Sequence, residues 1–213
     1  AYAMSLRGHG ASESSGLVAL TSCSAYIEDI RSVVEQIDGE PVLIGHSWGG
    51  YLLQRYLAKY RDCARAVLMA SAPPSTSIPA YWRMFRKFPW MVTVAHLTAR
   101  PHYVYSKVES VRELLFHPDA GEKEIQQYMN GMERISTLLY LQSIFCPPKA
   151  DKVWAEVLVI GGGGDEIYNS AMIAHTARAY DVEPVILPGA CHMMMNDPQW
   201  QATADRILEW LAG

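Results

Sequence analysis

The sequence has few of the features that mark secreted scaffolds, metal enzymes or membrane proteins. Its four cysteines are scattered, and their spacing indicates neither a disulfide framework nor a metal site, so we expect a reduced, cytoplasmic protein. A signal peptide remains open, because Ala1-Tyr2-Ala3 does not resemble a natural start. No His-Glu-x-x-His occurs, and we expect neither a catalytic metal nor a cofactor. No apolar run approaches the length of a membrane-spanning helix.

The chain also lacks a strong excess of positive or of negative charge. The chain carries 18 Lys and Arg against 22 Asp and Glu, a formal charge of −4, and no basic run. This argues against nucleic acid as a partner and leaves a small molecule as the expected one. The 213 residues, half of them hydrophobic, suffice for one sizeable core. The oligomeric state, including a homo-oligomer, stays open.

Residues 41–50, Pro-Val-Leu-Ile-Gly-His-Ser-Trp-Gly-Gly, are the most informative stretch. A strand-like run leads into a Gly-x-Ser-x-Gly pentapeptide at 45–49, and a helical pattern follows at once. This context predicts a nucleophile elbow, in which a sharp turn exposes the hydroxyl of Ser47. Strain at the serine requires small neighbours, which we expect Gly45 and Gly49 to supply. The amide of Trp48 would then point toward a developing oxyanion.

The remaining pattern alternates strands and helices. Strands are expected at 2–6, 41–44, 66–70, 157–160 and 182–187. Helices are expected from Ser22 or Ser24 to about residue 37, from the elbow to about 60, over 170–180, and from Asp197-Pro198 onward. Such alternation predicts an α/β fold, with a mostly parallel sheet flanked by helices on both faces.

A helical stretch interrupts this alternation between two proline pairs, Pro73-Pro74 and Pro147-Pro148. It has no strong strand pattern, and its apolar runs, among them 111–116 and 125–141, read as helices. We therefore expect a helical cap over 73–150, inserted between a first core part at 1–72 and a second at 151–213.

A serine nucleophile needs a base to take its proton and an acid to orient that base. Asp165 follows the expected strand at 157–160, and His192 follows the strand at 182–187, so both belong at the same sheet edge as Ser47. Glu166 is the alternative acid, but Asp165 comes first and has the shorter side chain. His46 would point away from Ser47 on an extended backbone and is interpreted as structural.

The chain resembles the α/β-hydrolase superfamily, in particular its cap-bearing esterases, lipases and C–C hydrolases. The matching segments are Leu6 to Ser12, Gly45 to Gly50, Gly164-Asp165 after a strand, and Gly189 to His192. The resemblance implies Ser47 as nucleophile, Asp165 as acid, His192 as base and residues 73–150 as the cap.

One departure from the family concerns the start of the chain. In the family, three strands and a His-Gly loop precede the Arg-Gly-His-Gly segment, and that loop donates the second oxyanion amide. The resemblance therefore implies an N-terminally incomplete fold, with the second donor upstream of Ala1. Usual domain size suggests that roughly sixty residues precede Ala1.

Together these features predict a serine hydrolase that cleaves an ester, or a related acyl bond, of a small and largely apolar substrate. Trp82, Phe85 and Met193 are the expected pocket residues, since aromatic and methionine side chains suit an apolar group. The alternative is that they only pack the cap onto the sheet. Two rival functions remain: a C–C bond hydrolase with the same triad, and a catalytically idle ligand-binding protein.

Overall fold

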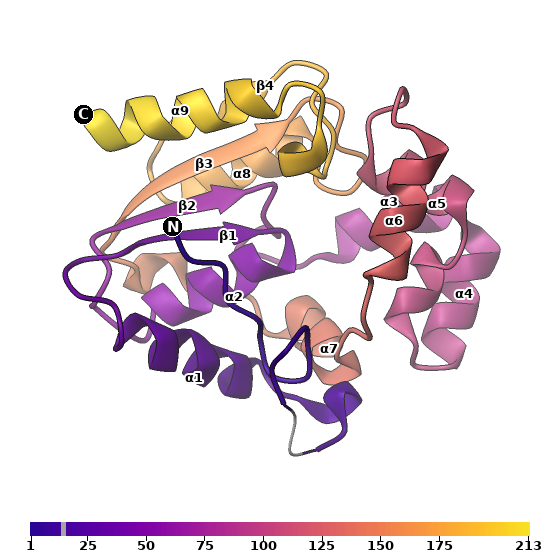
Figure 1. Cartoon of the computed structure of the whole chain (residues 1–213), viewed down its shortest axis with the longest axis horizontal. Coiled ribbons are helices and arrows are strands. Elements are labelled where there is room, and N and C mark those ends of the chain that lie inside the picture. Colours follow the sequence, from indigo (N-terminus) through magenta and orange to yellow (C-terminus); the bar gives the residue numbers. More distant parts are fainter. Residues whose placement is uncertain (14–15) are drawn as a thin grey trace.

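The computed structural model describes residues 1–13 and 16–213. Within these residues four parallel strands form one sheet in the order β1-β2-β3-β4. The strands are β1 (Val42–His46), β2 (Arg65–Met69), β3 (Glu156–Gly162) and β4 (Val185–Leu187). All four strands run in the same direction, so their carboxyl ends meet at one edge of the sheet (Figure 1). The predicted α/β fold class is confirmed.

The central strands are apolar on both faces, as parallel strands between two helical layers require. Successive residues alternate between two hydrophobic clusters: Leu68 and Val159 face one, while Val67 and Ile160 face the other. β1 lies at the edge of the sheet in the described part of the chain, and its Ile44 side chain is 53% exposed.

Helices cover both faces (Figure 1). Residues of α1 (Cys23–Val34), α2 (Trp48–Leu57) and α8 (Ser170–Ala179) join the larger hydrophobic cluster. α9 (Trp200–Ala212) covers the opposite face, where Ile207 and Trp210 pack against the smaller cluster. The Ser22 hydroxyl accepts a hydrogen bond from the amide of Ala25, so Ser22 is the N-cap of α1.

The chain between β2 and β3 is helical. It contains α3 (Ile78–Lys87), α4 (Pro89–Leu97), α5 (Val108–Leu115), α6 (Glu122–Asn130) and α7 (Thr137–Phe145). Figure 1 shows α3 to α6 grouped beyond the carboxyl ends of the strands, while α7 lies beside α1 and α2. Short 3₁₀ turns occupy 18–20 (η1), 101–105 (η2), 150–152 (η3) and 194–196 (η4). The domain boundaries at 72 and 150 stay a prediction.

Several expected elements are wrong or shorter than predicted. Residues 2–6 form no strand, because they have no ladder partner within the described chain; Tyr2 is 85% exposed. The last strand begins only at Val185, since the amide of Val182 bonds the carbonyl of Ala177 at the end of α8. The run at 125–141 is two helices, α6 and α7, because Ser136 caps the second of them.

The start of the last helix also differs from the prediction. α9 begins at Trp200 instead of at Asp197-Pro198. The Asp197 carboxylate is used in the preceding loop, where it accepts hydrogen bonds from the amides of Cys191, at 2.7 Å, and Gln199, at 2.8 Å.

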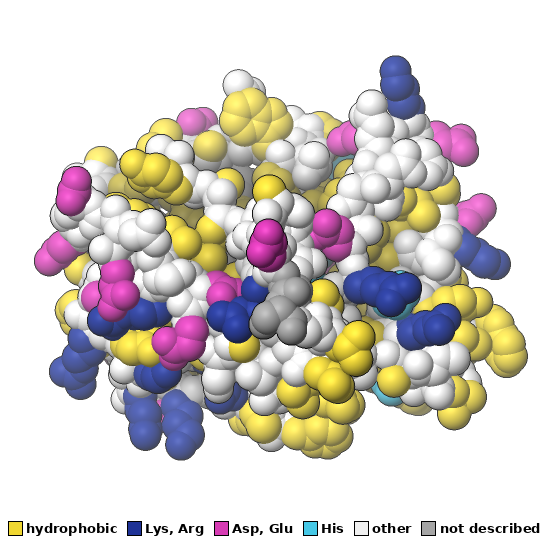
Figure 2. Space-filling view, turned by 60° about the horizontal axis from the view of Figure 1, so that its bottom comes forward, with side chains coloured by type: hydrophobic (Ala, Val, Ile, Leu, Met, Phe, Trp, Pro, Cys, Tyr) yellow, Lys and Arg dark blue, Asp and Glu magenta, His cyan; other side chains and the backbone are white. Residues whose placement is uncertain are grey.

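On the face seen in Figure 2, acidic and basic side chains are interspersed, and hydrophobic side chains gather on the side where α4 lies in Figure 1. Trp90 and Leu97 of α4 are 72% and 83% exposed. No helix in the described part of the chain is long and apolar enough to cross a membrane.

Candidate active site

The turn between β1 and α2 has the strained geometry of the predicted elbow. Ser47 adopts φ 54° and ψ −120°, a conformation that few non-glycine residues adopt. Its amide donates to the carbonyl of Met69 on the neighbouring strand, and its carbonyl accepts from the amides of Gly50 and Ala72. The backbone is therefore bonded on both sides of the strained residue. The Trp48 amide lies in the first turn of α2, where backbone N–H groups have no partner within the helix.

Close packing around the elbow depends on Gly45 and Gly50. A Cβ on Gly45 would lie 2.7 Å from the carbonyl oxygen of Gly49, and a Cβ on Gly50 would lie 2.2 Å from Ser71 Oγ. A Cβ on Gly49 would meet nothing within 4 Å. The expectation that Gly49 must be small for steric reasons is therefore wrong. After Ser47, the position that has no room for a side chain is Gly50, the next residue.

Gly50→Ala is expected to lower the free energy of unfolding by about 3 kcal/mol. The Ser71 hydroxyl cannot move aside without breaking its hydrogen bonds, since it is buried between Gln54 Nε2 and the carbonyl of Ala72. Gly49→Ala is the matched control and should be neutral or slightly stabilising, because alanine favours a helix. Urea unfolding of both variants measures the difference. Equal stabilities would contradict this account of the packing.

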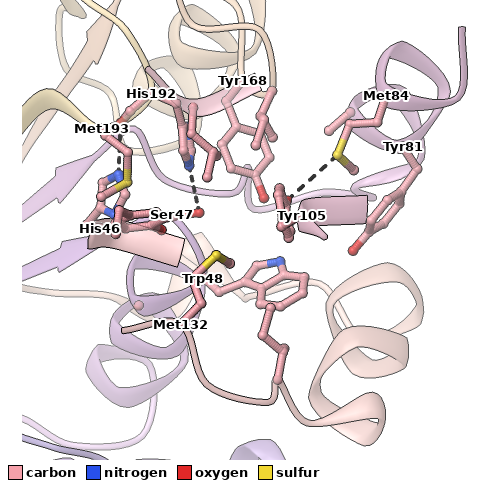
Figure 3. Close-up of a pocket in the computed structure, with 16 residues that line it drawn as sticks. His46, Ser47, Trp48, Tyr81, Met84, Tyr105, Met132, Tyr168, His192 and Met193 are labelled. Atoms are coloured by element: carbon pink, nitrogen blue, oxygen red, sulfur yellow. Dashed lines mark hydrogen bonds between the residues drawn. The ribbon is translucent and has the colours of Figure 1, made fainter. Parts of the chain in front are cut away.

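Ser47, Asp165 and His192 lie together at the carboxyl edge of the sheet. His192 Nδ1 is 2.8 Å from Asp165 Oδ2. His192 Nε2 is 3.0 Å from Ser47 Oγ, the bond that Figure 3 shows as a dashed line. A carboxylate only accepts, so Nδ1 carries the proton and Nε2 accepts from the serine hydroxyl. Asp165 and His192 are each 2% exposed, which keeps competing water from their hydrogen bond. A serine in this arrangement can pass its proton to imidazole.

The second oxygen of Asp165 is held by the backbone. Oδ1 accepts from the amides of Ile167, at 2.7 Å, and Tyr168, at 2.8 Å. Its neighbour Glu166 faces the other way and pairs with Arg83 at 2.9 Å and with Lys87 at 3.3 Å, both on α3. The structure therefore places the Asp165 carboxylate, and not the alternative Glu166, against the imidazole.

His46 lies nearer to the site than the sequence suggested. Its Nε2–H donates to the carbonyl of His192 at 2.9 Å, and the two rings are 4.9 Å apart. Burial, and then the adjacent His192, lower the pKa of His46 to about 4. His46 is thus neutral at pH 7. The expectation that it points away from Ser47 is wrong, because its side chain lines the same cavity, but its hydrogen bond fits a structural role.

Contacts from several elements hold the loop that carries His192. Asp197 is 1% exposed and fixes the amide of Cys191, while the amide of Met193 donates to the carbonyl of Leu115 at the end of α5. Three parts of the structure therefore position the His192 imidazole: His46 at the end of β1, Asp197 in the loop before α9, and the end of α5.

A cavity of about 240 Å³ opens beside Ser47 (Figure 3). Its walls come from the elbow, the 165–168 loop, the His192 loop and the helical segment 78–145. The side chains that line it are mostly apolar or phenolic: Trp48, Tyr81, Met84, Tyr105, Leu115, Tyr128, Met132, Ile135, Ile167, Tyr168 and Met193.

Of the three expected pocket residues, Met193 lines this cavity and the other two do not. Trp82 and Phe85 stack on each other, with ring centroids 5.5 Å apart, in a groove between α3 and α4 on the outside of the helical segment. Trp82 is 59% exposed. The opposite side of α3 faces the site instead, through Tyr81 and Met84.

Sequence reasoning missed several lining residues. Tyr168 lies three positions after Asp165 in the same loop, and this closeness to the expected acid could have indicated that Tyr168 lines the cavity. Tyr105 comes from η2, while Tyr128 and Met132 come from α6 and the loop just after it. No pattern in the sequence indicates that these two parts of the helical segment meet above Ser47.

No group of three or more His, Cys, Asp or Glu side chains in the described residues could hold a metal ion. The four cysteines are unpaired thiols; burial raises the pKa of Cys191, next to His192, to about 12, so it is not a thiolate. The expected absence of a metal and of a cofactor stays a prediction.

Comparison with known proteins places the chain among relatives of the same architecture. Monoacylglycerol lipase of Mycolicibacterium smegmatis is 26% identical over 225 residues, covering 99% of this chain and 77% of the relative. An esterase from Exiguobacterium antarcticum superposes with a TM-score of 0.71 at 15% identity, covering 98% of this chain and 80% of that structure. A thermophilic esterase from Thermogutta terrifontis gives 0.71 at 24% identity, covering 97% and 77%.

Likeness to solved structures at these identities shows the fold alone, since one fold supports many activities. The family assignment depends on the whole chain: the profile of the alpha/beta hydrolase family matches residues 1–206. The chain belongs to the alpha/beta hydrolase family.

Proposed function

We propose that this chain is a serine hydrolase that cleaves a carboxylic ester, or a related acyl bond, through an acyl-enzyme. The observation that carries the proposal is the hydrogen-bonded series Asp165–His192–Ser47, which ends at an apolar cavity. The names of the relatives, a monoacylglycerol lipase and esterases, agree with ester cleavage.

In the proposed mechanism, His192 Nε2 takes the proton of Ser47 as Oγ attacks the ester carbonyl carbon. The negative charge moves to the carbonyl oxygen, where the Trp48 amide is one stabilising donor. When the tetrahedral intermediate collapses, the C–O bond to the alcohol breaks and His192 returns the proton to the departing oxygen. Water then attacks the acyl-enzyme, with His192 as base, and releases the acid and free Ser47. Asp165 keeps the proton on Nδ1 throughout.

The size and composition of the cavity support a small, largely apolar substrate. A space of about 240 Å³, lined mainly by aromatic, methionine and aliphatic side chains, suits a short acyl or aryl group. We propose that residues 73–150 act as the cap, because α3, η2, α5 and α6 supply one wall of this cavity.

A fluorophosphonate probe tests the proposal. Its phosphorus is attacked by an activated serine and by no idle hydroxyl, so mass spectrometry should find one label on Ser47 and none in Ser47→Ala. Hydrolysis of p-nitrophenyl butyrate by the wild type should stop as labelling proceeds. An unlabelled Ser47 in folded protein would instead support the idle ligand-binding protein. Product analysis on a substrate panel separates ester cleavage from C–C bond cleavage.

A further inference from the structure

The cavity contains phenolic hydroxyls that have no part in the mechanism, and that of Tyr168 belongs to the side chain that packs against His192. The side chain is 3% exposed and lines the cavity, with its hydroxyl directed into the space between Ser47 and Tyr105 (Figure 3). Among the described residues, none accepts a hydrogen bond from this hydroxyl. Tyr168 Oη is not one of the buried side-chain polar atoms without a partner in the described residues, which are Tyr26 Oη, Asp62 Oδ1 and Thr203 Oγ1. The Tyr168 hydroxyl is therefore open to the cavity, where a bound ligand can accept its proton.

The neighbouring hydroxyl of Tyr81 differs, because its proton is already used. Tyr81 Oη lies 3.1 Å from Ser143 Oγ, and the Ser143 hydroxyl donates to the carbonyl of Tyr140 at 2.8 Å. Tyr81 is therefore the donor to Ser143. Burial raises the pKa of both Tyr81 and Tyr168, and hydrogen bonding from the Trp48 indole lowers it by a smaller amount. An indole N–H only donates, so Trp48 cannot accept the Tyr168 proton. The Tyr81 oxygen could accept one, but among the described residues its hydrogen bond with another hydroxyl is the bond to Ser143.

The position of Tyr168 is fixed relative to the catalytic groups. Its amide donates to Asp165 Oδ1 while Oδ2 of the same carboxylate accepts from His192. Its ring lies against the His192 ring, with centroids 5.7 Å apart and planes inclined by 54°. A hydroxyl held this way loses little entropy when it binds a ligand.

The mechanism determines which part of the substrate meets this side chain. His192 Nε2 must reach both Ser47 Oγ and the departing oxygen, so the alcohol part lies beside the imidazole. Tyr168 packs against that imidazole, and its hydroxyl faces the cavity. The alcohol part of a bound ester therefore lies within reach of the Tyr168 proton.

We infer that Tyr168 is a specificity-determining residue, whose hydroxyl donates a hydrogen bond to a second oxygen in the alcohol part of the substrate. The preferred substrates are then esters of short alcohols that carry an ether or hydroxyl oxygen, in place of purely alkyl esters. This inference rests on the proposed ester hydrolysis and adds the substrate class.

A pair of isosteric esters tests the inference. 2-Methoxyethyl butanoate and butyl butanoate differ only by an ether oxygen in place of a methylene, and their kcat/KM values give a preference ratio. In Tyr168→Phe this ratio should fall about tenfold, because the methoxyethyl ester loses a hydrogen bond that the butyl ester never makes. Tyr103→Phe is the control, because Tyr103 does not line the cavity, and it should keep the wild-type ratio.

The outcomes separate the two proposals. An unchanged ratio in Tyr168→Phe overturns the inference and leaves ester hydrolysis standing. An equal loss on both esters, with an altered pH profile, also overturns it, because this would mean that Tyr168 only positions His192. A wild type that hydrolyses neither ester, and whose Ser47 is unlabelled by a fluorophosphonate, overturns the proposed function and the inference together. Thermal unfolding of the variant confirms that the comparison is made on folded protein.

Discussion

Ser47→Ala is expected to reduce kcat for p-nitrophenyl butyrate hydrolysis by roughly a million-fold, since the nucleophile and its base act as a unit. Removing Oγ leaves His192 with nothing to activate in the first step. Only binding and the oxyanion donor would still contribute, and these account for a small residual rate. The measurement is steady-state hydrolysis, corrected for contaminating activity by titration of active sites with the fluorophosphonate.

This variant should fold normally. Alanine and serine tolerate the positive φ at position 47 about equally, and Ser47 Oγ has His192 as its hydrogen-bond partner among the described residues. Ser106→Ala, on the exposed turn after Tyr105, is the matched control and should keep full activity. A Ser47→Ala protein with undiminished turnover would refute the acyl-enzyme route, whatever the fold.

Asp165→Asn is expected to reduce kcat by about ten-thousand-fold, because an amide in place of the carboxylate favours the wrong imidazole tautomer. Asparagine keeps an oxygen for the amides of Ile167 and Tyr168, so the loop should stay in place. The loss would then come from the misplaced proton on His192 and from the missing negative charge beside the imidazolium.

Glu166→Gln is the matched control for the acid. Glu166 pairs with Arg83 and Lys87 at a partly exposed site, where an ion pair contributes little, and its loss should reduce kcat by less than about tenfold. Single-turnover acylation measured on both variants compares them directly. If Glu166→Gln lost as much activity as Asp165→Asn, the assignment of the acid would be reversed.

The larger part of the core architecture could be predicted from local patterns. The strands at 42–46, 65–69 and 156–162 are apolar runs flanked by turns, and each appears close to its expected bounds. The placement of Asp165 and His192 follows from a topological rule: the carboxyl ends of parallel strands meet at one edge. Spacing along the chain was therefore enough to bring these residues near Ser47.

Prediction failed where the outcome depends on which neighbour a segment meets. Residues 2–6 have strand composition but no ladder partner in the described chain, so they form no strand. Trp82 and Phe85 are aromatic, as a pocket residue would be, but the packing of α3 against α4 turns them outward. Gly49 fits the motif, but the close contact with Ser71 is made by Gly50.

The elbow, the order of Ser47, Asp165 and His192, and the alternation of strands and helices were determined by the sequence alone, because they depend on local conformation and on one rule of parallel sheets. Only the tertiary structure decided which helix faces line the cavity, that His46 supports the His192 loop, and that the Tyr168 proton is left without an acceptor among the described residues. Those features depend on contacts between segments distant in sequence, and such contacts are set by side-chain packing, for which one sequence carries no periodic signal.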